Sequence, residues 1–315
     1  MRAARIHAFG SAPVLDAVDD PRPAEGESLV EVIAAVVGHL DLGIATGNFP
    51  ILPQLPHIPG VSGAGRVIES ANHRRGAIVE IAGSQLGISR DGTWGEFAAV
   101  PDAALARVPS DVDLLQFLAF SGSFTTAHLA VSEIGKLEPG EQVIVTGAAG
   151  CVGSLAVQLA LARGASAVVG AVGREGRRRD VPSGARAVLD RAEAAACLNG
   201  CADLLIDTVG GRHLSMFLEL VRPGGRACLV GYTAGTALEI DLPRLLVADV
   251  RLLPVNSMTW REHMGPALRT AAIAELRKER FQIRVETYEL SDAPAALEQL
   301  RGGRARGRVI LVPDA

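Results

Sequence analysis

The stretch "VTGAAGCVGSLAVQLALARGASAVVGAVGREGRRR", Val145–Arg179, has the pattern of a buried strand, a glycine-rich turn, a helix and a second strand. Its glycines would have separate tasks. Gly147 permits a tight turn, Gly150 lets the backbone approach a pyrophosphate, and Gly153 lets the helix pack closely on the strand. The free N–H groups and the positive dipole end of the helix favour bound phosphates. The stretch predicts a dinucleotide-binding turn, with a turn that serves packing alone as the alternative. We expect the contacts from Gly147, Ala149, Gly150, Cys151, Val152 and Gly153.

The pattern around this stretch divides the chain. From Gln142 to Val255, short apolar strands alternate with helical segments, which is typical of a parallel, doubly wound sheet. Before about residue 120, short alternating runs separated by glycine and proline predict a compact β-rich domain. The sequence therefore predicts an α/β protein with two domains. Residues 1–121 with 264–315 form the β-rich domain, and residues 122–263 form an inserted cofactor domain.

Composition excludes several classes of protein. The net charge of -4 over 315 residues gives no basic footprint for nucleic acid. None of the cysteines has the C-x2-C spacing of a structural zinc site. The N-terminus lacks the apolar core of a signal peptide, and no apolar run reaches the ~20 residues that span a bilayer. We expect a soluble cytoplasmic protein without nucleic-acid or membrane partners.

The end of the second strand indicates which dinucleotide binds. Val172 and Gly173 stand where an NAD site carries the acidic residue that holds the ribose hydroxyls. An arginine-rich run follows, and guanidinium groups favour a 2′-phosphate through charge and bidentate geometry. The sequence therefore predicts NADPH, held at Gly173, Arg174 and Arg177. Glu175 within the run opposes this prediction, and the remaining arginines are expected on a solvated face.

Several further stretches match one family in order along the chain. They are "LPHIPGVSGAGRVIE" (Leu55–Glu69), "GTWGEFAAVP" (Gly92–Pro101), "LLIDTVGG" (Leu204–Gly211), "RPGGRACLVG" (Arg222–Gly231) and "GRARGRVILVP" (Gly303–Pro313). With the glycine turn, they resemble the medium-chain dehydrogenase/reductase superfamily, specifically its zinc-free quinone oxidoreductase (zeta-crystallin-like) and enoyl reductase branch. The resemblance implies a GroES-like catalytic domain, an inserted Rossmann domain, an active site between them and a homodimer.

The resemblance also provides a test for zinc. The zinc-dependent branch holds its catalytic metal with a cysteine and a histidine. At those positions this chain has Gly38 and Val61, and Ser62 stands at the neighbouring glutamate. Glycine and valine cannot ligate zinc, and the four-cysteine structural lobe is missing. We therefore expect no metal site, and a zinc alcohol dehydrogenase is the disfavoured alternative.

Without a metal, suitable hydride acceptors are quinones and α,β-unsaturated carbonyls, including enones of secondary metabolism. The charge that develops on oxygen needs a donor. The tyrosines common in this branch are replaced by Gly43 and Phe49, which are expected to line an apolar substrate site. His39 is the candidate acid near neutrality. Asp41, at a position that the family keeps acidic, would hold the loop geometry or an arginine rather than transfer a proton, and the resemblance places Thr126 beside the nicotinamide. A structural role for His39, with protonation by solvent, is the alternative.

The resemblance supplies the remaining contacts. Val230, Gly231 and Tyr232 would meet the nicotinamide carboxamide, as would Asn256, and Arg308 would reach the cofactor phosphates. Together these observations predict an NADPH-dependent, zinc-independent oxidoreductase that acts on a small, hydrophobic, conjugated substrate. A non-catalytic NADPH-binding protein of crystallin or sensor type is the alternative from another class.

Overall fold

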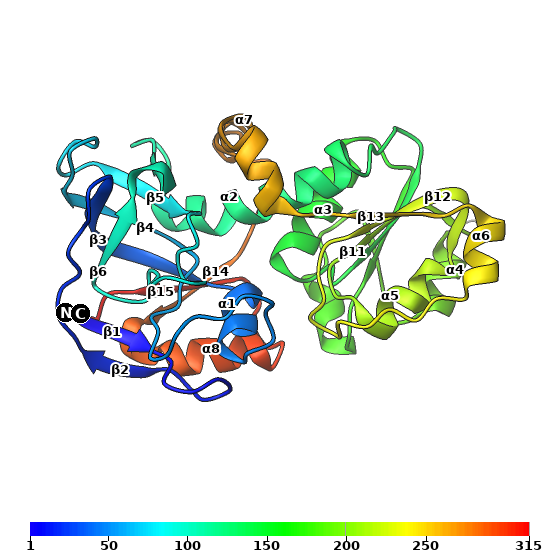
Figure 1. Ribbon diagram of the computed structural model, residues 1–315. Coiled ribbons are helices and arrows are strands. Elements are labelled where there is room, and N and C mark those ends of the chain that lie inside the picture. Colours follow the sequence, from blue (N-terminus) through cyan, green and yellow to red (C-terminus); the bar gives the residue numbers. More distant parts are fainter. Residues whose placement is uncertain (199, 315) are drawn as a thin grey trace. The chain divides into compact units, whose positions relative to one another are not determined.

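The structure is a computed structural model that describes residues 1–198 and 200–314. The chain forms two compact units, one made of Met1–Ala119 with Arg284–Ala315 and the other of Phe120–Ile283 (Figure 1). Ala315, the last residue of the predicted β-rich domain, lies outside the described residues. One unit is built on a mixed sheet and the other on a parallel sheet, so the predicted α/β class is confirmed.

The first unit contains a seven-stranded sheet in the order β14-β15-β3-β4-β5-β7, with β6 paired to β3. The strands of this sheet are β3 Glu27–Val37, β4 Ser62–Glu69, β5 Ile78–Ala82, β6 Phe97–Pro101, β7 Leu105–Arg107, β14 Val285–Glu289 and β15 Arg308–Val312. A separate two-stranded sheet pairs β1 Arg2–Arg5 with β2 Val14–Ala17. The helices of this unit include α1 His39–Ala45 and α8 Ala293–Arg301. The long strand β3 alternates buried and half-buried residues, which gives it one core face. Ile310 of β15 pairs with Val36 of β3, so the C-terminal tail completes this sheet.

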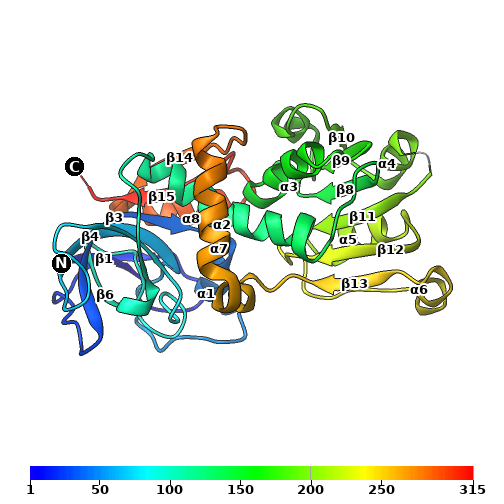
Figure 2. The same cartoon turned by 90° about the horizontal axis from the view of Figure 1, so that it is seen from above.

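The second unit contains a six-stranded parallel sheet in the order β10-β9-β8-β11-β12-β13. Its strands are β8 Gln142–Thr146, β9 Ala167–Ala171, β10 Arg186–Val188, β11 Ala202–Asp207, β12 Val221–Leu229 and β13 Arg251–Pro254. Its helices include α3 Cys151–Ala162, α4 Arg191–Cys197, α5 Gly211–Leu218, α6 Leu242–Ala248 and α7 Ser257–Arg277. This is the doubly wound order of a dinucleotide-binding sheet. The order reverses beside β8, where such sheets bind their ligands (Figure 2).

The C-terminal limit of the second unit differs from the predicted one. The expected boundary after residue 263 falls inside α7, which continues through Pro266 to Arg277. Ala272 of α7 and the following Phe281 are buried in the same apolar cluster as Val143 of β8. Because this packing ties α7 to the parallel sheet, the unit extends to Ile283. The other division falls after Ala119 within α2, Leu114–His128, two residues before the predicted position at 121.

One helical stretch, Leu114–Glu133, is long and apolar enough to cross a membrane by composition alone. Of its 18-residue apolar window, 67% is buried inside the structure. Phe117, Phe120 and Phe124 on this stretch are each 1% exposed. Burial of this extent also characterises a core helix of a folded domain, so the stretch is weak evidence for a membrane span.

Candidate functional site

The glycine turn between β8 and α3 has the geometry that its spacing predicts. Gly147 has a φ of +62°, and a Cβ there would lie 2.3 Å from Thr208 Oγ1. A Cβ on Gly153 would lie 2.3 Å from the Gly147 carbonyl oxygen. Gly150 is exposed and caps the N-terminus of α3, and a Cβ there would meet only that same oxygen, at 3.2 Å. The turn is therefore closely packed at Gly147 and Gly153 and open to solvent at Gly150.

The open side of the turn fits a phosphate group. Ala149, Cys151 and Val152 around the N-terminus of α3 are half-buried, and no acidic residue lies in the first helical turn. The first N–H groups of a helix have no partner within it, and its dipole favours negative charge there. The predicted turn residues are thus brought together at the switch point of the sheet, where they could hold a dinucleotide.

A buried carboxylate, for which the sequence predicts no role, supports this turn. Asp207, at the end of β11, is 0% exposed and accepts hydrogen bonds from Thr146 Oγ1 (2.6 Å) and the Gly210 N–H (2.7 Å). Burial raises the pKa of Asp207. Thr208 Oγ1 donates to the Thr146 carbonyl oxygen at 2.8 Å. These contacts fasten the end of β8 to β11. In the sequence, this network is indicated only by a polar residue at the end of each of two apolar strands, Thr146 and Asp207.

The structure separates the two arginines that were expected to bind the 2′-phosphate. Gly173 and Arg174 follow β9 and are exposed, with nothing within 4 Å of a Cβ at Gly173. Arg177 lies in a 3-10 turn, and its guanidinium donates a 2.8 Å hydrogen bond to the Ala149 carbonyl oxygen. Its Nε lies 3.0 Å from Asp180 Oδ2, and the two side chains are only 11% and 5% exposed. Arg177 is therefore committed to the glycine turn.

The other two arginines of the run, Arg178 and Arg179, differ in their contacts and exposure. Arg178 is bound by Glu175 and by both carboxylate oxygens of Glu193, each at 2.8 Å, and donates to the Ala187 carbonyl oxygen at 2.7 Å. The hydrogen bonds and charges of Glu193 and Glu175 raise the pKa of Arg178. Arg179 is exposed. Arg178 therefore stabilises the local fold, and the exposed positive charge at the end of β9 comes from Arg174 and Arg179.

The loop after β12 lies against the end of β11. Val230 donates its main-chain N–H to the Asp207 carbonyl oxygen at 2.8 Å. A Cβ on Gly231 would lie 2.2 Å from the Thr208 carbonyl oxygen, so this close approach requires glycine. Tyr232 follows and is 46% exposed. The three predicted carboxamide contacts therefore lie beside the Asp207 network.

Thr126 and Asn256 both use part of their polar side chains within the fold. Thr126 Oγ1, half-buried on α2, donates to the Gly122 carbonyl oxygen at 3.1 Å. Asn256 caps α7, and its Oδ1 accepts from the N–H groups of Met258 (3.1 Å) and Thr259 (3.3 Å). If Asn256 contacts the cofactor as predicted, the donor would be its amide nitrogen. If Thr126 does so, its hydroxyl oxygen would act as an acceptor.

In the first unit, Asp41 fixes the loops around α1. It is 0% exposed, and its carboxylate accepts from the N–H groups of Gly38 (2.8 Å), Gly60 (3.2 Å) and Val61 (3.0 Å). Burial raises the pKa of Asp41 to about 6, opposed by these donors and by the charge of Arg308. The carboxylate thus joins the loops that carry Gly38, Gly60 and Val61.

Arg308 and His39 lie in the same part of this unit. Arg308 Nη1 would be 3.8 Å from a Cβ on Gly38. His39 is an exposed residue, and partial desolvation of its ring together with the charge of Arg308 lowers its pKa to about 4. The predicted role of His39 as an acid depends on the ordinary pKa of ~6.5. With a pKa of about 4, the His39 side chain is a neutral imidazole at pH 7. It can donate a hydrogen bond but is a poor acid there.

The two predicted substrate residues are neighbours. A Cβ on Gly43 would lie 4.0 Å from the Phe49 Cβ, and both residues are half-buried. Phe9 packs on the same loop, 3.3 Å from the position of a Cβ on Gly47. The loop continues into exposed Ile51. These contacts give the loop after α1 an apolar wall.

The residues do not fit the zinc site of the zinc-dependent branch. Across residues 1–198 and 200–314, no group of three or more His, Cys, Asp and Glu side chains is placed to hold a metal ion. At the two positions that the resemblance assigns to ligands, Gly38 and Val61 instead donate their main-chain N–H groups to Asp41.

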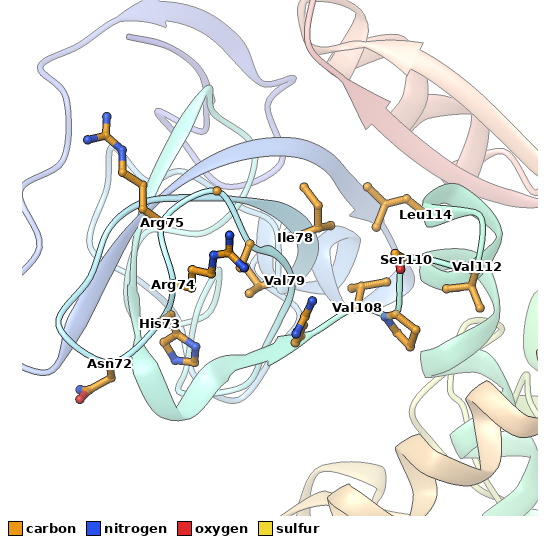
Figure 3. A pocket seen from close by; sticks show the side chains of 14 residues that line it. Asn72, His73, Arg74, Arg75, Ile78, Val79, Val108, Ser110, Val112 and Leu114 are labelled. Carbon is orange, nitrogen blue, oxygen red and sulfur yellow. The ribbon is translucent and has the colours of Figure 1, made fainter.

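A separate hollow of about 720 Å³ lies in the first unit, beside the loop between β4 and β5. Arg74, Arg75 and Arg107 line it with His73, over an apolar floor that includes Val79. Figure 3 shows His73 and Arg74 at the hollow and Arg75 directed away from it. The lining contains none of the predicted site residues.

Comparison with known proteins places this arrangement in a family. A family model described as zinc-binding dehydrogenase matches residues 151–272. A quinone oxidoreductase of Homo sapiens is 30% identical, across 99% of this chain and 98% of its own length. The chain belongs to the medium-chain dehydrogenase/reductase superfamily.

Other members of the medium-chain dehydrogenase/reductase superfamily resemble it as well. A zinc-type alcohol dehydrogenase-like protein of Schizosaccharomyces pombe is 32% identical, over 78% of this chain and 74% of its own. The solved quinone oxidoreductase of Pseudomonas syringae pv. Tomato shares the fold, with a TM-score of 0.89, 23% identity and 99% coverage of both chains. Membership of this superfamily confirms the predicted family and identifies the chain as an oxidoreductase.

Proposed function

We propose that this chain is an NADPH-dependent oxidoreductase that transfers hydride to a quinone or an α,β-unsaturated carbonyl without zinc. The observation that carries the proposal is the open glycine turn at the N-terminus of α3, with exposed Arg174 after the neighbouring strand β9. Bound NADPH would supply the hydride, and the protein would supply orientation and electrostatics.

The residues of the second unit fit the phosphates of this cofactor. Gly150 and the first turn of α3 would hold the diphosphate with N–H groups. Arg174 would hold the 2′-phosphate, since Val172 and Gly173 supply no carboxylate to hold a free ribose hydroxyl. One solved relative in fold is named an NAD-dependent alcohol dehydrogenase, at 24% identity, so cofactor preference has to be measured on this chain.

Independence from zinc is supported by residue chemistry. Gly38 and Val61 have no side-chain atom that binds a metal. A quinone or an enone accepts hydride into a conjugated system, so hydrogen-bond donors or fixed charge can stabilise its oxygen in place of a Lewis acid. Relatives named quinone oxidoreductase, such as the human protein, support this substrate class.

The first unit would supply the substrate site. Gly43 and Phe49 would form an apolar wall for a flat, conjugated molecule. Asp41 would keep the loops in place. Neutral His39 would donate a hydrogen bond to the developing oxyanion, with Arg308 adding positive charge and solvent delivering the proton. In a second interpretation, His39 and Arg308 together meet the cofactor phosphates. His39→Gln would then weaken NADPH binding, whereas the first interpretation predicts a lower kcat.

The test is cofactor binding and oxidation against a panel of quinones, enones and enoyl thioesters, with metal analysis of the same preparation. We expect at least about tenfold tighter binding of NADPH than of NADH. Equal Kd values would overturn the NADPH assignment, and stoichiometric zinc would overturn zinc independence. Tight binding without turnover across the panel would favour the second candidate, a crystallin-like or sensor role. The presence of Gly43 and Phe49 in place of tyrosines supports that candidate.

We further propose a homodimer in the cytoplasm, where the four free cysteines would stay reduced. The apolar face of α6 supports self-association, since Leu246 and Val247 are 70% and 88% exposed. Strand β13 lies at the adjacent edge of the parallel sheet. A modest net charge argues against a nucleic-acid partner, and we propose no membrane partner.

A further inference from the structure

Arg177 joins two segments that the sequence places far apart. Its Nη2 donates a 2.8 Å hydrogen bond to the carbonyl oxygen of Ala149, inside the glycine turn after β8. Its own main chain belongs to the turn after β9, where its N–H donates to the Arg174 carbonyl oxygen at 3.0 Å. One side chain therefore ties the proposed diphosphate site to the segment that carries Arg174.

The guanidinium is held in this orientation from its other side. Arg177 Nε lies 3.0 Å from Asp180 Oδ2, and the Asp180 side chain is 5% exposed. This contact is an ion pair, and because a guanidinium is planar, a negative charge on its Nε edge favours one direction of the Nη groups. Asp180 thus orients Nη2 toward Ala149.

This contact has an electrostatic consequence for the turn. A carbonyl oxygen in a phosphate-binding turn presents negative charge that opposes an anion. A charge-assisted hydrogen bond to that oxygen offsets the negative charge and holds the peptide in one orientation. The adjacent N–H groups at the N-terminus of α3 then remain directed to the open side of the turn.

We propose that Arg177 is a positioning residue for the cofactor site. It holds the glycine turn in its binding shape through Ala149 and does not read the 2′-phosphate, so it supports NADPH and NADH equally. Selectivity for the 2′-phosphate then belongs to Arg174. This inference rests on the proposed cofactor site and adds to it which arginine determines affinity and which determines selectivity.

The test compares Arg177→Met with Arg174→Gln by titration of both cofactors. We expect Arg177→Met to raise the Kd of NADPH and of NADH by the same factor, on the order of 10- to 100-fold, because a hydrogen bond to a charged group is lost. Arg174→Gln should raise the Kd of NADPH alone. If Arg177→Met instead lowers the NADPH preference as Arg174→Gln does, Arg177 reads the phosphate and the proposal is wrong.

Hydrogen–deuterium exchange of the cofactor-free protein tests the positioning role without any ligand. Arg177→Met should accelerate exchange in residues 147–153, and Asp180→Asn should do so to a smaller extent. The matched control is Arg178→Met, on the same 3-10 turn, whose contacts are with Glu175, Glu193 and Ala187. It should leave exchange in residues 147–153 unchanged.

The outcomes separate this inference from the proposed function. Unchanged exchange in Arg177→Met and Asp180→Asn overturns the inference, whatever the protein binds. A wild-type protein that binds neither cofactor overturns the proposed function, and accelerated exchange would still show that Arg177 holds the turn.

Discussion

The carboxylate of Asp41 accepts a 3.0 Å hydrogen bond from the main-chain N–H of Val61. The same carboxylate accepts from the Gly38 N–H at 2.8 Å. The two stretches in which a zinc-dependent relative would carry its ligands are therefore joined by a buried side chain of this chain. Loop geometry at the proposed substrate site depends on that carboxylate.

The pH dependence of the protein's stability should reflect the raised pKa of the buried Asp41. Its folded-state pKa of about 6 lies above the ordinary value of ~3.9. The stability that this group contributes is therefore fully present below pH ~4 and is lost as the pH rises through about 6. Asp41→Asn removes this dependence. The difference in free energy of unfolding between Asp41→Asn and wild type should therefore shift in favour of the variant by on the order of 2–3 kcal/mol between pH 4 and pH 7. Urea unfolding at both values measures it, and a difference independent of pH would contradict it.

The pH profile should not report His39 near neutrality. Its pKa of about 4 makes it neutral throughout the range from pH 5.5 to pH 8. His39→Gln should therefore change the height of the kcat/KM profile over that range but not its shape. A wild-type ionisation near ~6.5 that disappears in His39→Gln would show that His39 titrates as an ordinary histidine.

Gly153 should not tolerate even a methyl group. A Cβ there would lie 2.3 Å from the Gly147 carbonyl oxygen, so Gly153→Ala must displace α3 or the turn. We expect a loss of about 1–3 kcal/mol in the free energy of unfolding, together with weaker cofactor binding. The matched control is Gly176→Ala, where nothing lies within 4 Å of the new atom, and its effect should stay within about 0.5 kcal/mol. Chemical denaturation of both variants checks this, and equal effects would count against the close packing.

Arg226 should be among the residues that matter most for stability. It is 6% exposed, donates to both carboxylate oxygens of Glu141 at 2.8 and 2.6 Å, and donates to the Gly135 carbonyl oxygen at 2.6 Å. Arg226→Met leaves buried acceptors without a partner, which costs about 3–5 kcal/mol. Arg222→Met removes an ion pair of a side chain that is 44% exposed and should cost at most about 1 kcal/mol. Comparable losses in urea unfolding would refute the distinction.

Self-association should depend on the exposed face of α6. Val247 is 88% exposed, and a charge there would oppose burial against a second copy. Val247→Glu is expected to shift the protein from dimer to monomer in sedimentation velocity while leaving its circular dichroism unchanged. A wild-type protein that sediments as a monomer would rule out the dimer.

Local pattern was sufficient for much of the fold. The parallel sheet, its switch point and the separate tasks of Gly147 and Gly153 follow from apolar strands and glycine spacing within a few residues. The extent of the second unit did not, since α7 continues through Pro266, and its assignment depends on the burial of Ala272 against distant strands.

The site shows the same division more clearly. The sequence by itself determined a glycine turn followed by arginines and the absence of ligand atoms at Gly38 and Val61. These properties reside in single residues and their neighbours. Only the tertiary structure decided that Arg177 binds Ala149, 28 residues away, while Arg174 is an exposed residue. It also decided that Arg308 lies near His39, where its charge and partial desolvation lower the pKa of the imidazole. Side-chain direction and local electrostatics depend on groups brought together by folding, which residue spacing alone does not specify.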